Sequence, residues 1–315
     1  MTSPAQRRSL AGEEEALARL AARLPPPPAG EVWIGDDAAV LAGDRGPLLF
    51  ATDLVAEGVH FDRRLSSLAD VGWKLLAANL SDIAAMGGRP LRCVVALAGG
   101  LGDDLDALYD GLEEAAAAFS CPVVGGDLSA PPLGGGLCVS LAVLGTTDGR
   151  PPVTRAGGRP GDAVLVSGPL GAAAAGLRLL RADPAAEGPA VAAHRRPVPR
   201  LAAGRAAAVA GARAMIDVSD GLGLDLDRLA RASGVGVELD TVPTAPEASE
   251  AEALGGGEDY ELVVALADPG ALVAAHAAAG LAPPIEIGRL VADPSRRRLQ
   301  EAPLPIAGWR HRAGV

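Results

Sequence analysis

Acidic residues recur at five places along this chain where an apolar stretch ends or turns. The five motifs, in chain order, are Gly35-Asp36-Asp37, Thr52-Asp53, Ser81-Asp82, Gly125-Gly126-Asp127 and Asp217-Val218-Ser219-Asp220-Gly221. The chain has a single lysine, Lys74, so few ammonium groups are present to neutralise these carboxylates. Gathered carboxylates repel one another unless a hard cation binds them, and oxygen-only ligand sets suit Mg²⁺. The pattern therefore predicts a site for several metal ions and a phosphate-bearing substrate.

Each motif has a simpler structural explanation when it is taken alone. Adjacent aspartates in a turn are usually solvated, and Asp82 could lie on the polar flank of a helix. Ser219 or Asp220 could be a helix N-cap, although a cap leaves Asp217, inside an apolar run, unexplained. Because all five motifs agree, we favour one metal and phosphate site over five separate structural roles.

The sequence lacks the commonest phosphoryl- and acyl-transfer motifs. It contains no G-x-x-x-x-G-K-[ST], no protein-kinase signature set and no G-x-S-x-G. Gly168-Pro169-Leu170-Gly171 precedes an expected helix and could bind an anion at the helix N-terminus. Tight strand-to-helix packing is the better interpretation of these glycines.

Composition indicates a soluble α/β protein with room for two domains. The chain has 315 residues, 49% of them hydrophobic and 3% aromatic, with 41 glycines and 26 prolines. Cys93, Cys121 and Cys138 show no CxxC spacing, so we expect reduced, buried cysteines in a cytoplasmic protein. The net charge of −11 argues against nucleic-acid binding. No stretch is typical of a membrane span or a secretory signal.

Strands and helices are expected to alternate and to position the motifs. In the first half, strands are expected over 31–34, 38–41, 47–52, 91–98, 121–124 and 137–145, and helices over 13–24, 67–86 and 104–119. In the second half, strands are expected over 162–167, 214–218, 236–239 and 260–266, and helices over 170–181, 201–210 and 222–232. A Pro/Gly/Arg-rich stretch, 151–161, predicts a boundary between domains 1–150 and 151–315.

These motifs, taken together, resemble those of the thiamine-monophosphate kinase family of the aminoimidazole ribonucleotide synthetase-like superfamily. The two most specific strings are Asn79-Leu80-Ser81-Asp82-Ile83-Ala84-Ala85-Met86-Gly87 and Gly256-Gly257-Glu258-Asp259-Tyr260-Glu261-Leu262. Glu57-Gly58-Val59-His60-Phe61 matches as well. The resemblance runs from about residue 30 to the C-terminus. It implies a two-domain α/β fold with mixed sheets, whose N-terminal domains pair into a dimer barrel.

The resemblance also implies the reaction, its cofactors and its site residues. The reaction would be ATP-dependent phosphorylation of thiamine monophosphate to thiamine diphosphate by a homodimer that binds several Mg²⁺ ions. The implied metal ligands are Asp37, Thr52, Asp53, Asp82, Asp127, Asp217 and Asp220. The implied ATP contacts are Tyr109, Gly126, Asp127, Arg155 and Ser219, and the implied thiamine contacts are His60, Glu258 and Trp309. The N-terminal domain would bind ATP and Mg²⁺ and dimerise, and the C-terminal domain would complete the site.

Three positions depart from the family pattern. Ala51 stands where a hydroxyl residue is common, so a metal contact there would use the backbone carbonyl. Leu128-Ser129 replaces threonines after the Gly-Gly-Asp motif, and Arg312 stands where phenylalanine is usual. These changes bear on the details of the pocket more than on the reaction.

The acceptor in this reaction is itself a phosphate, so no general base and no covalent nucleophile are expected. The difficulty is charge repulsion, since two unit charges about 4 Å apart repel by roughly 4 kcal/mol at an effective dielectric constant of 20. Lys74 lies in the helix expected over 67–86, and we do not expect it to offset this repulsion. Two alternatives remain: another superfamily enzyme that uses the same ATP site for ring closure, and a non-catalytic nucleotide-binding subunit.

Overall fold

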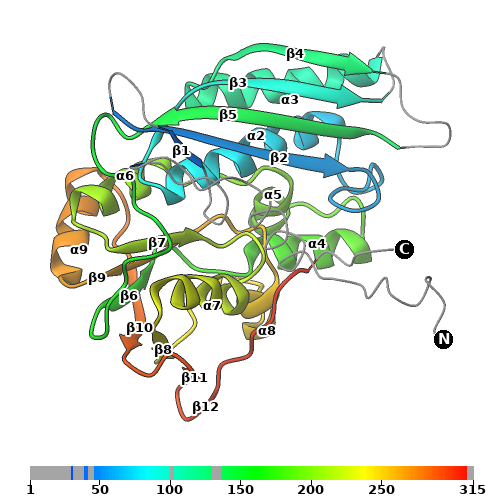
Figure 1. Cartoon of the computed structure of the whole chain (residues 1–315). Coiled ribbons are helices and arrows are strands. Elements are labelled where there is room, and N and C mark those ends of the chain that lie inside the picture. Colours follow the sequence, from blue (N-terminus) through cyan, green and yellow to red (C-terminus); the bar gives the residue numbers. More distant parts are fainter. Residues whose placement is uncertain (1–29, 31–38, 42–45, 100–102, 130–135, 311–315) are drawn as a thin grey trace, which may run out of the picture.

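Two β-sheets, each with its own helices, make up the protein (Figure 1). The structure, a computed structural model, describes residues 30, 39–41, 46–99, 103–129 and 136–310. The helix expected over 13–24 and the strand expected over 31–34 lie outside these residues. The predicted α/β class with mixed sheets is confirmed. No helix in the described ranges is both long and apolar enough to cross a bilayer.

The first sheet has five strands in the order β1-β2-β5-β3-β4. The strands are β1 (Ala39–Leu41), β2 (Leu48–Ala56), β3 (Arg89–Ala98), β4 (Val123–Ser129) and β5 (Cys138–Thr146). Only β3 and β4 run parallel among these pairs. Helices α2 (Leu68–Ala85) and α3 (Asp103–Phe119) cover one face, and the opposite face carries no helix in Figure 1. Alternate residues of β2 are therefore buried against the helices, as Leu49 and Val55 are, or exposed, as Phe50 and Leu54 are.

Helix α2 lies between the two sheets and carries many of the polar residues of interest. It begins at a capping box in which Ser67 Oγ accepts the Asp70 N–H, and Asp70 accepts the Ser67 N–H. One side packs on β2 and β5, and another side meets β7 (Ala214–Asp217) and α6 (Leu201–Val209). The end of α2 joins a core cluster with residues of the second sheet, including Ala84, Met215 and Leu262. The helix thus brings polar side chains to the junction of the sheets.

The second sheet has seven strands in the order β12-β11-β8-β10-β6-β9-β7. Besides β7, these are β6 (Ala163–Val166), β8 (Gly236–Leu239), β9 (Leu262–Leu266), β10 (Ile285–Val291), β11 (Arg297–Leu299) and β12 (Ala302–Pro303). Besides α6, its helices are α4 (Ala172–Ala182), α5 (Pro189–Arg195), α7 (Leu222–Ser233), α8 (Glu250–Gly255) and α9 (Pro269–Ala278). Strands β6, β7 and β9 are buried along their whole length. Asp217, at the end of β7, is therefore a carboxylate in an apolar setting.

Most expected elements are confirmed within one or two residues, but two expectations about strand ends are wrong. Strand β2 continues through Thr52 and Asp53 to Ala56, so these two residues do not end it. Strand β4 contains the Gly125-Gly126-Asp127 motif instead of preceding it, and it is an edge strand with Val124 exposed. Helices α5, α8 and α9 and strands β10, β11 and β12 were not expected at all.

Candidate active site

Acidic side chains from four separate segments lie near Tyr260, at the junction of the two sheets. Asp53 comes from β2, Asp82 from α2 and Asp217 from β7, while Glu258 precedes β9. Burial and the nearby carboxylates of Glu258, Asp53, Asp217 and Asp82 raise the pKa of Tyr260 well above its usual value, so its phenol stays protonated. The buried Tyr260 side chain therefore lies within electrostatic reach of all four carboxylates.

Two buried residues of α2 orient two of these aspartates. The Asp53 N–H donates to Asn79 Oδ1 at 3.0 Å, and Asn79 Nδ2 donates to the Leu75 carbonyl at 2.8 Å. Ser81 Oγ donates to Asp217 Oδ2 at 2.6 Å, in a contact that links α2 to the second sheet. Asn79 and Ser81 are fully buried. Their place in a mostly apolar helix is explained, because each satisfies a backbone or carboxylate group at the site.

The Gly256–Leu262 motif packs directly against the Asp217–Gly221 motif. The Glu258 N–H donates to the Ser219 carbonyl at 2.8 Å, and the Tyr260 N–H donates to the Val218 carbonyl at 2.9 Å. Glu258 and Tyr260 have φ values of +58° and +52°, a left-handed conformation that non-glycine residues seldom adopt. A Cβ at Gly257 would lie 2.6 Å from the Ser219 carbonyl oxygen, so this approach requires glycine.

Asp220 pairs with an arginine in this structure. Its Oδ2 accepts a hydrogen bond from Arg228 Nη1, which also donates to Asp225 Oδ1 at 2.8 Å. Burial and the neighbouring Asp220 carboxylate raise the pKa of the fully buried Asp225 to about 7. Arg155 lies close enough to oppose the charge of Arg228, and the Trp309 N–H donates to the Asp220 carbonyl at 2.9 Å. A metal ion at Asp220 would therefore compete with Arg228.

Glu258 receives the only lysine of the chain. Lys74 Nζ donates to Glu258 Oε2 at 2.7 Å, and His194 Nδ1 lies 3.5 Å from the same oxygen. Burial opposes ionisation of Glu258, but Lys74, His194 and His60 outweigh it and lower the pKa of this carboxyl. His60 Nδ1 accepts the Ala56 N–H at 3.1 Å. Lys74 lies in the expected helix and pairs with Glu258; that it does not offset the repulsion between the two phosphate-bearing substrates stays a prediction.

Asp259, next to Glu258, caps a helix of the second domain. Its carboxylate accepts the N–H groups of Gly171 at 2.7 Å and Ala173 at 3.2 Å, at the start of α4. Burial raises the pKa of Asp259 to about 6. A Cβ at Gly171 would lie 2.8 Å from the Ala253 N atom, so the glycines before α4 serve close packing, as expected. The anion at the N-terminus of α4 is therefore the carboxylate of Asp259.

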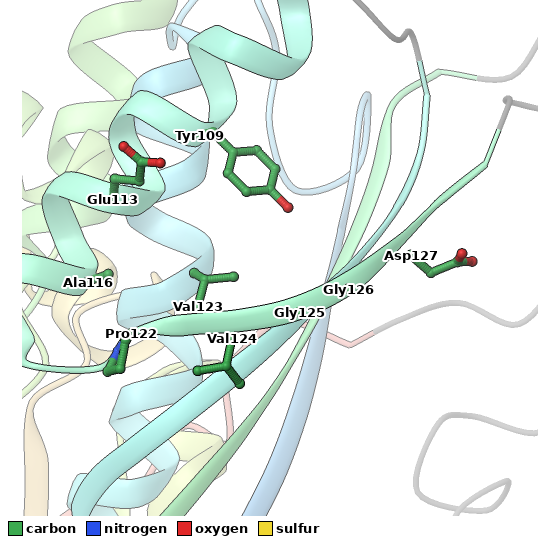
Figure 2. Close-up of a pocket in the computed structure, with 9 residues that line it drawn as sticks. All are labelled: Tyr109, Glu113, Ala116, Pro122, Val123, Val124, Gly125, Gly126 and Asp127. Atoms are coloured by element: carbon green, nitrogen blue, oxygen red, sulfur yellow. The ribbon is translucent and has the colours of Figure 1, made fainter.

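A cavity of about 610 Å³ brings together three of the residues expected to contact ATP (Figure 2). The Tyr109 ring projects from α3 over β4, whose Gly126 and Asp127 line the same cavity. Ala116, Val123 and Val124 add an apolar lining. This volume lies within the usual range for small-molecule sites. Arg155 and Ser219 do not line this cavity. Ser219 belongs to the Asp217–Gly221 motif, and Arg155 lies near Arg228.

In a single chain, the sheet separates Asp127 from the other aspartates. Asp127 is exposed and pairs with Ala96 on the face that carries no helix, whereas Asp53 lies on the helix-facing side of β2, together with Leu49 and Val55. Three strand-to-strand steps separate β2 from β4, a distance of about 14 Å. A Cβ at Gly126 would lie 2.0 Å from the Val95 carbonyl oxygen, so this glycine first serves the pairing of β3 with β4.

Thr52 likewise points away from Asp53, because neighbouring residues of a strand face opposite sides. It is exposed, and its Oγ1 donates to the Leu141 carbonyl at 2.9 Å. Asp37 and Arg312 lie outside the described residues. Ala51 is buried in β2, and Ser129 ends β4.

The donor atoms at this junction fit Mg²⁺ held in part by a substrate. Within the described ranges, no three His, Cys, Asp or Glu side chains lie close enough to hold a metal ion by themselves. Mg²⁺ usually keeps several waters and binds one or two carboxylates together with substrate phosphates. The carboxylates of Asp53, Asp82 and Asp217, gathered around Tyr260, offer oxygen donors of this kind.

Comparisons with known proteins place the chain in a family. Residues 35–147 match the model of the AIR synthase related protein N-terminal domain, and residues 159–299 match that of its C-terminal domain. A thiamine-monophosphate kinase of Rhodopirellula baltica is 35% identical over 303 residues, 89% of each chain. That of Bacillus subtilis is 35% identical over 250 residues, 74% of this chain and 76% of the relative.

A solved structure supports the same assignment. The structure described as "AaThiL complexed with AMPPCP and TMP" superposes with a TM-score of 0.83 at 30% identity and covers 99% of both chains. The chain therefore belongs to the AIR synthase related family and, within it, to the thiamine-monophosphate kinases.

Proposed function

We propose that this protein transfers the γ-phosphoryl group of ATP to thiamine monophosphate and forms thiamine diphosphate. The observation that carries the proposal is that Asp53, Asp82 and Asp217, from three different elements, all lie near Tyr260, as Glu258 does. The name shared by the relatives, and the AMPPCP and TMP named for the solved AaThiL structure, support the same reaction.

Oxygen ligands for Mg²⁺ would come from the acidic motifs. Asp53, Asp82 and Asp217 would hold the ions at the junction, and Asp37, Thr52, Asp127 and Asp220 complete the proposed set. Bound Mg²⁺ supplies charge neutralisation to the phosphates of both substrates. Asn79 and Ser81 keep two of these groups in place, because Asn79 binds the Asp53 backbone and Ser81 binds the Asp217 carboxylate.

The two substrates would bind on either side of this cluster. Tyr109, Gly126, Asp127, Arg155 and Ser219 are the proposed ATP contacts. His60, Glu258 and Trp309 are the proposed contacts of the thiamine portion. The indole of Trp309 is 51% exposed next to the Asp220 backbone, and an exposed indole can stack on a flat heterocycle.

In this proposal, the protein positions the two substrates and stabilises their charges, and the phosphoryl group passes directly and in line from ATP to the acceptor phosphate. The acceptor phosphate is already ionised at neutral pH, so no side chain has to remove a proton from it. Tyr260 stays protonated among the carboxylates and adds no negative charge where two polyanions must meet. We therefore assign no general base and no covalent nucleophile.

We further propose that the protein works as a homodimer. The helix-free face of the first sheet exposes Phe50, Leu54, Val94 and Val124, with exposed fractions between 42% and 53%. Pairing two such faces into a barrel would bury them and remove the edges at β1 and β4. Leu54→Arg should yield a monomer in sedimentation velocity with little turnover; a fully active monomer would refute this part.

The proposed division of labour is by domain. Residues 1–150 would bind ATP and Mg²⁺ and dimerise, and residues 151–315 would complete the metal and substrate site. Support comes from the two sheets, since no described strand of one sheet pairs with a strand of the other. The three cysteines are free thiols, which supports a reducing, cytoplasmic setting.

The test is an ATP/Mg²⁺ assay with thiamine monophosphate and, in parallel, free thiamine, with thiamine diphosphate quantified directly. We expect product from the monophosphate alone. ATP hydrolysis or ATP binding without thiamine diphosphate would favour another superfamily substrate or a binding role.

A further inference from the structure

The only lysine of the chain is buried against a carboxylate of the proposed substrate pocket. Lys74 is 7% exposed, and its ammonium group donates to Glu258 Oε2 at 2.7 Å. The pair joins α2 to the segment before β9, 184 residues away in sequence. A buried ammonium group requires a partner, and Glu258 is the partner that the structure supplies.

The two oxygens of Glu258 have different surroundings. Oε2 accepts from Lys74 and faces His194 Nδ1 at 3.5 Å. Oε1 receives no hydrogen bond from any residue in the described part of the chain, and the Glu258 side chain is 31% exposed. The backbone is held at φ +58°, with the Glu258 N–H bound to Ser219. One oxygen is thus fixed from inside the protein, and the other has no hydrogen-bond donor among the described residues.

His194 presents a second polar atom to the fixed oxygen. Its Nδ1 is the single buried side-chain nitrogen or oxygen without a hydrogen-bond partner among the described residues. A shift of a few tenths of an ångström would bring it within hydrogen-bonding distance of Glu258 Oε2. Contacts of this kind often shorten only when a substrate is bound.

We propose that Lys74 and His194 are positioning residues that hold Glu258 Oε2, so that Oε1 accepts a hydrogen bond from an amine of the substrate. Lys74 cancels the charge of Glu258, so the pair offers an acceptor without net negative charge. Such a group selects an N–H donor over a cation. This inference rests on the proposed function, in which the donor is the exocyclic amine on the pyrimidine ring of thiamine monophosphate, not its thiazolium ring.

A double-mutant cycle tests whether Lys74 acts through Glu258. Lys74→Met and Glu258→Gln should each raise KM for thiamine monophosphate roughly ten- to hundredfold, with KM for ATP within about twofold of wild type. The double variant should be no worse than either single variant, since glutamine needs no counter-ion. The double variant also keeps the test valid if the Lys74→Met single variant folds poorly. Multiplicative losses in the double variant would overturn the inference.

A substrate analogue tests the chemical class of the ligand group without any substitution. In oxythiamine monophosphate, a carbonyl group replaces the exocyclic amine. Wild-type enzyme should disfavour this analogue by tenfold or more in kcat/KM, and Glu258→Gln and the double variant should lose most of this discrimination. Equal use of both substrates by wild type would overturn the inference while leaving the kinase activity standing.

Trp73→Phe is the matched control, because it removes a different hydrogen bond between α2 and the second half of the chain. Trp73 neighbours Lys74 on α2, and its Nε1 donates to the Pro197 carbonyl at 2.8 Å, away from Glu258. This variant should keep the wild-type KM and discrimination. If it reproduces the Lys74→Met phenotype, Lys74 is a structural tie and not a positioning residue. If wild type forms no thiamine diphosphate, the proposed function fails first and this inference fails with it.

Discussion

Ser81→Ala is the most informative single substitution at the junction of the two sheets. It deletes a 2.6 Å hydrogen bond and leaves Asp217, which is 2% exposed, without that donor. Losing a buried hydrogen bond to a carboxylate costs about 2 kcal/mol of unfolding free energy. For a chain of 315 residues that unfolds as one unit, this corresponds to a fall in Tm of roughly 3 °C. Asp217 is also a proposed metal ligand, so the apparent Mg²⁺ affinity in the kinase assay should fall about tenfold or more.

Differential scanning calorimetry and turnover against Mg²⁺ concentration measure the two effects. Ser295→Ala is the matched control, because Ser295 Oγ donates to Asp293 Oδ1 at 2.7 Å in an exposed turn. Exposed hydrogen bonds contribute little, so this variant should match wild type in both Tm and Mg²⁺ dependence. A Ser81→Ala protein with lower Tm but unchanged Mg²⁺ dependence would refute the idea that Ser81 orients a metal ligand.

Three further predictions address the acidic cluster, the thiamine pocket and acid stability. Asp82→Asn should abolish turnover at saturating Mg²⁺ and keep the wild-type circular dichroism spectrum; near-normal turnover would contradict the metal assignment. Trp309→Ala should raise KM for thiamine monophosphate and leave KM for ATP unchanged, and equal losses would count against stacking. Burial and nearby Lys74 lower the pKa of His194 to about 4, below the value of about 6.5 in an unfolded chain. The unfolded chain therefore takes up the proton first as pH falls from 6.5 to 4. Between pH 7 and pH 5, the free energy of unfolding measured by urea titration should fall by about 2 kcal/mol more in wild type than in His194→Gln. Identical decreases in the two proteins would contradict the lowered pKa of His194.

The elements with strong local signals could be predicted from sequence. The apolar spacing of residues 67–86 gave α2 within one residue at each end. Local signals also existed for two helices that were missed. Ser249 and Glu252 form a capping box before α8, and Pro269 follows the Asp268 cap of α9. Both helices therefore have N-terminal caps that are readable in the sequence.

The predicted ends of β2 and β4 were wrong because polar residues were interpreted as strand ends. Asp53 can lie inside β2 because Asn79, from α2, meets its backbone N–H. Gly126 can lie inside β4 because β3 approaches so closely that a larger residue would collide with Val95. Both reasons are contacts between elements, so periodicity and turn propensity within one segment do not reveal them.

The cluster at the site could be predicted in part. Ser81 lies seven residues after Lys74, about two helical turns, so the two share a face of α2 and point toward the same region. That spacing could have placed Lys74 near the site. Its partner Glu258, and the nearby His194, come from distant segments, and only the packing of α2 against the second sheet brings them together.

The central claim is direct phosphoryl transfer between two substrates at the junction of the sheets. A single-turnover experiment with γ-³²P-labelled ATP, thiamine monophosphate, Mg²⁺ and enzyme in excess tests it most directly. We expect label to pass from ATP to thiamine diphosphate at one rate, with no labelled protein at any time and no transfer by the Asp82→Asn variant. Label that appears first on the protein, or only in inorganic phosphate, would contradict it.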